Sequence, residues 1–392
     1  MVKDAPDACD DGADVAPGQD GRPAATLFRT IVEQRLARRG VLAGAVRLAP
    51  LLAFSPSMFA AGAATARAAT DAALTFRPIA ISGADKVIVA DGHAADVLLR
   101  WGDPLFEGVS GLDTATLSDP AKSELLNNAD AAALQEKRFG YNCDYNGFFP
   151  LPGFASASSS HGLLATNHEY TDDALMLAGF PAYNRFRADA SKARAEVRAL
   201  IDRTKGAIVH VQQAAHGVSI VEIRGGGGRW TVERGSRLNR RITAATPIDI
   251  TGPAAGYRLL RTEADPAGRR VLGTLANCSG GKTPWGTLLT CEENLDAYFA
   301  NYDRLLTQAK KDPSLAPVVA AHARLPLSTG QSIRGWELVD DRFDAARHPA
   351  EALRFGWCVE IDPYDPASPP RKLTALGRFK HEAANTMVAK TG

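Results

Sequence analysis

The sequence has almost no net charge. Its 45 Lys and Arg residues nearly cancel its 44 Asp and Glu residues, which leaves a formal charge of +1. Proteins that bind nucleic acid through the phosphate backbone usually carry a basic surplus or a basic stripe. The charge balance therefore argues against a nucleic-acid partner, and any partner has to be inferred from individual sites.

Cysteine is also scarce, with five residues in a chain of 392. No two of them form a CxxC pair, and their spacing fits no zinc finger. So few cysteines in so long a chain do not make a disulfide-stabilised scaffold. Buried thiols, one isolated disulfide or a thiolate metal ligand remain open for the set Cys9, Cys143, Cys278, Cys291 and Cys358.

Complete motifs for nucleotide binding and for serine hydrolases are missing as well. Residues 281–283 read Gly-Lys-Thr, but a phosphate-binding loop needs a glycine where Ala276 stands. Pro284 follows, and the chain then continues toward an apolar run typical of a strand rather than a helix. The glycines here are better explained by a close approach of the backbone to a centre. Residues 156–160 lack the pattern of a nucleophile elbow.

The N-terminal part has the composition of an export signal. Residues 1 to about 30 are rich in Asp, Gly, Ala and Pro, a composition that favours disorder. The pair Arg38-Arg39 precedes a modest apolar run, and residues 66–68 (Ala-Arg-Ala) resemble a cleavage site. Arg47 interrupts the apolar run, which argues against a stable membrane span. We predict a twin-arginine signal region over 1–68, recognition by the twin-arginine translocation machinery, and a periplasmic or secreted protein.

The rest of the chain, 69–392, is dominated by short apolar runs with period-two alternation, which indicate strands. Two strands joined by the glycines of 225–228 predict a hairpin, and a longer loop predicts a second hairpin between 358–362 and 372–376. Two charged, alanine-rich stretches predict helices over 188–204 and over 303–323, the second broken near Pro313. The predicted strands are 86–90, 97–100, 161–166, 216–223, 257–261, 285–290 and 356–361.

The sequence does not show the regular alternation of strands and helices that is typical of a parallel sheet. We therefore expect an all-β fold with inserted helices. Periodicity alone does not separate a sandwich, a barrel and a propeller. Three strands end in acidic and polar residues, at 166–169, 290–294 and 379–382. A β-propeller brings such strand ends together around a central channel, so this recurrence favours a propeller.

These strand ends also contain the residues from which a metal site is built. Carboxylate oxygens suit calcium, and carboxylates together with a thiolate can hold iron. Each motif by itself is typical of surface polarity, but three on one strand-rich frame favour a metal site. A turn-rich aromatic segment, 142–151, is either a loop in the wall of that site or an ordinary Asn-Gly turn.

Five runs resemble the PhoX-type alkaline phosphatases: NCDYNGFFPL, LLATNHEYT, LANCSGGKTPWGTLLTCEEN, GWCVEIDPYDP and GRFKHEAA. The resemblance implies a β-propeller with inserted helices that hydrolyses phosphate monoesters to scavenge phosphate, using iron and calcium. It implies Cys291 as the thiolate on iron. The implied oxygen ligands are Glu169, Glu292, Glu382, Glu293 and Asn167, with Asp144 and Cys278 as further candidates.

Chains of this family run well beyond 392 residues, so we expect this chain to hold an incomplete propeller. Two alternatives stay open. One is a periplasmic propeller that binds calcium without catalysis. The other is a propeller hydrolase that acts on another class of ester.

Overall fold

The computed structural model describes residues 78–153, 155–177 and 190–388. Two compact units, 1–95 and 96–392, make up the chain, and each is considered by itself. The described part of the first unit, 78–95, contains no helix or strand. The predicted signal region, 1–68, lies outside the described residues.

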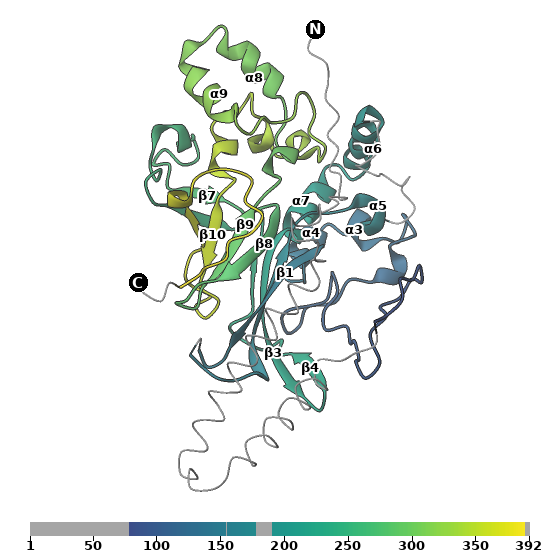
Figure 1. Cartoon of the computed structure of the whole chain (residues 1–392). Coiled ribbons are helices and arrows are strands. Elements are labelled where there is room, and N and C mark those ends of the chain that lie inside the picture. The colour runs from purple at the N-terminus through teal and green to yellow at the C-terminus, as the bar shows by residue number, and fades with distance from the viewer. Residues whose placement is uncertain (1–77, 154, 178–189, 389–392) are drawn as a thin grey trace, which may run out of the picture. The chain divides into compact units, whose positions relative to one another are not determined.

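The second unit contains two β-sheets (Figure 1). The first has the strand order β1-β2-β3-β4, and β5 also pairs with β3. All of its pairings are antiparallel. Its strands are β1 Cys143–Pro150, β2 His161–His168, β3 Gly217–Gly226, β4 Arg229–Val232 and β5 Arg240–Ile242.

The second sheet has the order β7-β6-β11-β10-β9-β8 and is mixed, because β6 and β11 run parallel. Its edge strand β8 packs beside β1 of the first sheet (Figure 1). The strands are β6 Pro247–Thr251, β7 Arg270–Leu272, β8 Asn277–Lys282, β9 Leu288–Glu292, β10 Cys358–Ile361 and β11 Arg371–Leu373.

Helices are inserted between the strands. Among the described residues no helix is both long and apolar enough to span a membrane. The α-helices are α3 Glu124–Asn127, α4 Ala131–Gln135, α5 Asp173–Met176, α6 Ala190–Arg203, α7 Ala207–Ala215, α8 Tyr302–Ala309 and α9 Ala316–His322. Short 3-10 turns cover Thr114–Thr116, Arg258–Leu260, Leu295–Ala297, Pro313–Leu315, Trp336–Leu338, Asp341–Phe343, Glu351–Arg354 and Thr374–Leu376.

Strand β3 shows how the sequence pattern produces the core. Successive side chains of a strand point to opposite faces. Val218 and Ile220 enter the main hydrophobic core, whereas Val221 and Ile223 enter a smaller cluster with Leu105. Both faces of β3 are therefore buried, which explains its nearly continuous apolar run.

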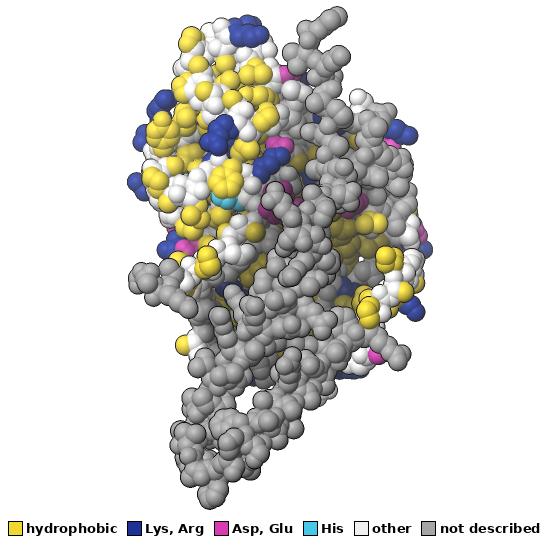
Figure 2. Space-filling model, in the orientation of Figure 1, with side chains coloured by type: hydrophobic (Ala, Val, Ile, Leu, Met, Phe, Trp, Pro, Cys, Tyr) yellow, Lys and Arg dark blue, Asp and Glu magenta, His cyan; other side chains and the backbone are white. Residues whose placement is uncertain are grey.

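On the face drawn in Figure 2, hydrophobic side chains spread over the region of α8 and α9, with Lys and Arg among them. This region lies between β9 and β10 in the sequence. Pro313 begins the 3-10 turn that separates the two helices, because proline fits the first turn of a helix but not its interior.

Several sequence predictions are confirmed. These are the strands predicted at 161–166 and 216–223, the hairpin across 225–228, the helix predicted at 188–204 and the broken helix predicted at 303–323. The second hairpin forms between β10 and β11. Its strand β11 is short, and residues 374–376 form a 3-10 turn.

Other predictions are wrong. The structure has no strand at 86–90 or 97–100, and residues 258–260 form a 3-10 turn. Within the segment 142–151, expected to be a loop or a turn, residues 143–150 form strand β1. The strand predicted from residue 285 begins only at Leu288, since residues 284–287 make a turn.

Candidate metal centre

Two β-bulges lie at the edges where the two sheets meet. In β1, Cys143 pairs with His168 and Asn146 pairs with Thr166, so two residues of β1 oppose the single residue Asn167. Asp144 is one of these two residues of β1. A bulge turns side chains away from the regular alternation of a strand, and bulges are common beside functional sites.

The second bulge lies in β8. Asn277 pairs with Glu292 and Gly280 pairs with Thr290, so Cys278 and Ser279 together oppose one residue of β9. Ala276, directly before this strand, has φ 52°, a left-handed conformation that is unfavourable for a residue with a Cβ atom. The strained residue, Ala276, therefore lies directly before the bulged strand that carries Cys278.

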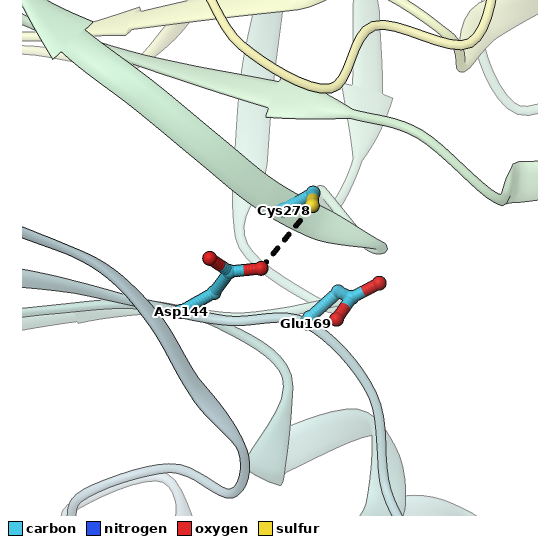
Figure 3. A group of neighbouring side chains, drawn as sticks. All are labelled: Asp144, Glu169 and Cys278. Atoms are coloured by element: carbon cyan, nitrogen blue, oxygen red, sulfur yellow. Dashed lines mark hydrogen bonds between the residues drawn. The ribbon is translucent and has the colours of Figure 1, made fainter. Parts of the chain in front are cut away.

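Asp144, Cys278 and Glu169 converge at this junction (Figure 3). One ligand atom from each of them lies within 4.8 Å of the others. The Cys278 thiol donates a hydrogen bond to Asp144 Oδ2 at 3.1 Å. Glu169 directly follows the last residue of β2, and its backbone N–H donates to Asn142 O at 3.2 Å. Three distant segments of the chain thus supply one small group of acidic and thiol side chains.

Asn167 connects the two sheets beneath this group. Its Nδ2 donates to Cys278 O at 2.6 Å and to Ser279 O at 3.2 Å. The side chain is fully buried, and its Oδ1 has no hydrogen-bond partner. A buried amide oxygen without a donor is costly unless a cation or another donor satisfies it. The amide therefore fixes the Cys278 backbone and leaves one oxygen available.

The local electrostatics favour a bound cation. Burial raises the pKa of the Cys278 thiol, and the hydrogen bond to Asp144 and the charges of Glu169, Asp144 and Glu293 raise it further. Burial and the charge of Glu382 raise the pKa of Glu293, while Lys380 partly offsets this shift. Negative charge is thus concentrated around Cys278, and a metal ion would stabilise it.

The predicted ligands separate into two groups. Glu169 and Asn167 lie at the junction, and Glu293 interacts electrostatically with Cys278. Glu382 is exposed, and its backbone carbonyl accepts a hydrogen bond from Ser279 N at 2.9 Å. Its charge acts on Glu293 and so belongs to the same neighbourhood.

Cys291 and Glu292 have other contacts. The Cys291 sulfur lies 3.6 Å from that of Cys358. Glu292 forms a buried ion pair with Lys372 at 2.7 Å, and its second carboxylate oxygen accepts backbone N–H bonds from Gly356 and Trp357. Both of its oxygens are engaged in holding the sheet together. Among the described cysteines, Cys278, only a further candidate from the resemblance, lies with two carboxylates.

Sequence reasoning gave low weight to Asp144 and Cys278 because a bulge is not visible in a pattern of apolar residues. The usable signal was local. Cys278 precedes a glycine that the structure requires, because a Cβ atom on Gly281 would lie 2.1 Å from Ala384 O. Gly281 thus permits a close approach to the backbone of Ala384, and the approach of these glycines to a bound centre stays a prediction.

Comparison with known proteins gives the family. The model of the alkaline phosphatase PhoX family matches residues 74–392. The chain belongs to this family. At 34% sequence identity and a TM-score of 0.63 it is also similar to Pseudomonas fluorescens PhoX, whose structure holds vanadate, a transition-state analogue. None of the curated proteins compared matches the chain.

The match covers 81% of this chain and 47% of the Pseudomonas fluorescens protein, so the chain spans about half the length of that relative. The matched region contains the whole junction of Asp144, Glu169 and Cys278. These residues fit a metal site by their chemistry, with two carboxylates, a thiol and the unpartnered oxygen of Asn167.

Proposed function

We propose that this chain carries part of the metal centre of an enzyme that hydrolyses phosphate monoesters. The convergence of Asp144, Glu169 and Cys278 at the two bulges, inside the region matched by the family, is the observation that carries the proposal. A relative with vanadate bound supports a phosphoryl-transfer reaction for the family. Cations at such a site supply positive charge that offsets the charge on the phosphate oxygens.

The protein's own residues would prepare the site in three ways. Asp144 accepts a hydrogen bond from the Cys278 thiol, so the two groups are already oriented toward a shared space. The Nδ2 group of Asn167 holds the Cys278 backbone, and its Oδ1 atom has no hydrogen-bond partner. Glu293 and Glu382 add negative charge beside the group and would strengthen the attraction for a cation.

Iron and calcium are the metals that we propose, on the family resemblance and on the mixed donor set. The thiol of Cys278 with the carboxylates suits iron, and the carboxylate and amide oxygens suit calcium. In this proposal Cys278 takes the role that the sequence motif suggested for Cys291.

The wider architecture and the location are proposals as well. The two sheets that meet edge to edge are consistent with blades of a β-propeller, which is the fold that the resemblance implies. The arginine pair before an apolar run and an Ala-Arg-Ala site supports export by the twin-arginine route to the periplasm or beyond.

The test combines metal content with activity. Asp144→Asn, Glu169→Gln and Cys278→Ser are each compared with the parent chain and with Cys143→Ser as the matched cysteine control. Metal bound per chain is measured by elemental analysis, and phosphate release from a simple aryl phosphate is followed with and without a chelator. We expect each of the first three variants to weaken metal binding by at least about 100-fold and to lower phosphate release in parallel.

The control Cys143→Ser should retain its metal, because Cys143 is exposed and lies outside the group. Full metal content in the Cys278→Ser and Glu169→Gln variants would overturn the assignment of the site. Metal binding without phosphate release, even when the chain is extended to the length of the Pseudomonas fluorescens relative, would support a non-catalytic calcium protein instead.

A further inference from the structure

Two cysteines lie directly opposite each other in the second sheet. Cys291 of β9 pairs with Cys358 of the antiparallel strand β10, and their sulfur atoms are 3.6 Å apart. The exposed fractions of the two residues are 0% and 2%. Both occur as free thiols in this structure.

The type of pairing decides how close the two backbones are. In an antiparallel ladder, hydrogen-bonded and non-hydrogen-bonded pairs alternate, and the side chains are closer in the second type. Glu292 N donates to Trp357 O at 3.3 Å, which makes the neighbouring pair, Glu292 and Trp357, a hydrogen-bonded one. Cys291 and Cys358 are therefore a non-hydrogen-bonded pair. The Cα separation of such a pair, about 4.5 Å, lies within the range that a disulfide requires.

No other described cysteine is bonded to this pair of sulfur atoms. Cys278, on the next strand of the sheet, directs its thiol to Asp144. Cys143 is exposed at the start of β1. The ring of His381 lies against the pair on one side, with Nδ1 3.4 Å from the sulfur of Cys358. The other two described cysteines, Cys143 and Cys278, therefore have surroundings of their own, away from this pair.

We propose that Cys291 and Cys358 are a redox modification site that closes into a cross-strand disulfide when the protein meets a peroxide. One thiolate attacks the peroxide oxygen and becomes a sulfenic acid, while the other peroxide oxygen leaves and is protonated to water. The second sulfur then displaces the hydroxyl group, forms the S–S bond and releases a second water. Two thiols are oxidised and one hydrogen peroxide is reduced, so atoms and electrons balance.

Burial explains why a small oxidant is the appropriate reagent. Exchange with a protein disulfide or with glutathione disulfide requires the larger reagent to approach the sulfur atom directly. Both cysteines are buried, so such a reagent has no access to either sulfur. The adjacent thiol also protects against over-oxidation, because the resolving sulfur is already 3.6 Å away when the sulfenic acid forms.

The bond would act on a defined segment. Cys291 and Cys358 are 67 positions apart, and the segment between them contains α8 and α9. Closing this loop restricts the unfolded chain and ties β9 to β10 in the folded one. We expect the oxidised protein to melt about 5–10 °C higher than the reduced protein.

The experiment uses the full chain, reduced and then exposed to hydrogen peroxide at increasing ratios. Remaining thiols are alkylated under denaturing conditions, and the protein is digested without reduction. We expect a cross-linked peptide pair that contains Cys291 and Cys358, lighter by two hydrogen atoms than the two separate peptides, and a raised Tm that returns to its starting value on reduction. Cys143→Ser should keep the cross-link, whereas Cys291→Ser and Cys358→Ser should each lose it.

The parent chain alone can overturn the proposal, so the test does not depend on the folding of a variant. Reduced Cys291 and Cys358 at a peroxide ratio that already oxidises the exposed Cys143 would refute it. Sulfinic or sulfonic acid at either position, or a disulfide that includes Cys143 or Cys278 instead, would also refute it. Phosphatase activity is not a readout here, so failure of this site and failure of the proposed function are separate results.

Discussion

The buried ion pair of Glu292 and Lys372 allows a sharp test of the role of the TCEEN segment, 290–294. Their charged atoms are 2.7 Å apart, and both side chains are fully shielded from solvent. Burial lowers the pKa of Lys372 to about 8, and Glu292 is the main charge that opposes this shift. Glu292→Gln therefore leaves the Lys372 ammonium group buried without its carboxylate partner, while the hydrogen bond to Arg354 O at 3.0 Å remains. Breaking one side of a buried pair costs about 3–5 kcal/mol.

We expect Glu292→Gln to lower the free energy of unfolding by about 3 kcal/mol, a large share of the roughly 5–15 kcal/mol typical of a folded protein. Urea unfolding, followed by circular dichroism in a chelator, measures this loss without any contribution from bound metal. The double variant Glu292→Gln/Lys372→Met removes the stranded charge and should recover at least about 1 kcal/mol.

Glu169→Gln is the matched control, since it makes the same chemical change at the junction with Cys278. It should weaken metal binding and leave the chelated protein within about 1 kcal/mol of the parent. A loss below about 1 kcal/mol for Glu292→Gln, together with loss of metal, would refute the structural role and restore Glu292 as a ligand.

Two further predictions concern stability. Burial lowers the pKa of His322 to about 4, so its ring stays neutral in the folded protein while the unfolded chain takes up a proton below about pH 6.5. The free energy of unfolding should therefore fall as the pH drops from about 6.5 to 4. A His322→Gln variant should lose less of it over this range in urea titrations. Equal slopes of unfolding free energy against pH for the variant and the parent would contradict the reasoning. Gly217 has φ 92°, and a Cβ atom there would lie 2.0 Å from Ile242 O, so Gly217→Ala should cost about 3 kcal/mol or more. Gly226→Ala, where no atom lies within 4 Å, should stay within about 0.5 kcal/mol, and similar losses for both would argue against strain.

Much of the fold followed from local sequence patterns. The run that forms β3 was predicted as a strand because its residues are β-branched and apolar, and its glycine turn fixed the hairpin with β4. The apolar patterns predicted strands wrongly where the side chains are exposed. The apolar run at 86–90 lies in a part of the chain without strands, and its Val87 and Val89 are exposed. Without a sheet to pair with, β-propensity alone does not form a strand.

The candidate site was predicted only in part. Glu169 and Asn167 stand in a short motif at the end of a strand, and both reach the junction. Cys278 and Asp144 are separated by 134 positions, and a hydrogen bond between them depends on β8 packing beside β1. The family resemblance implied Cys291 as the thiolate ligand and Cys278 only as a further candidate, whereas the structure places Cys278 with Asp144 and Glu169.

The sequence by itself determined the chain's family, its main strands, its helical insertions and the residue types of a metal centre, because these depend on composition and short-range spacing. Only the tertiary structure decided which residues meet. One extra residue in β1 and one in β8 shift the register, turn Asp144 and Cys278 toward Glu169, and leave Cys291 facing Cys358. Such a register is set by the pairing of strands distant in the chain, which no local pattern encodes.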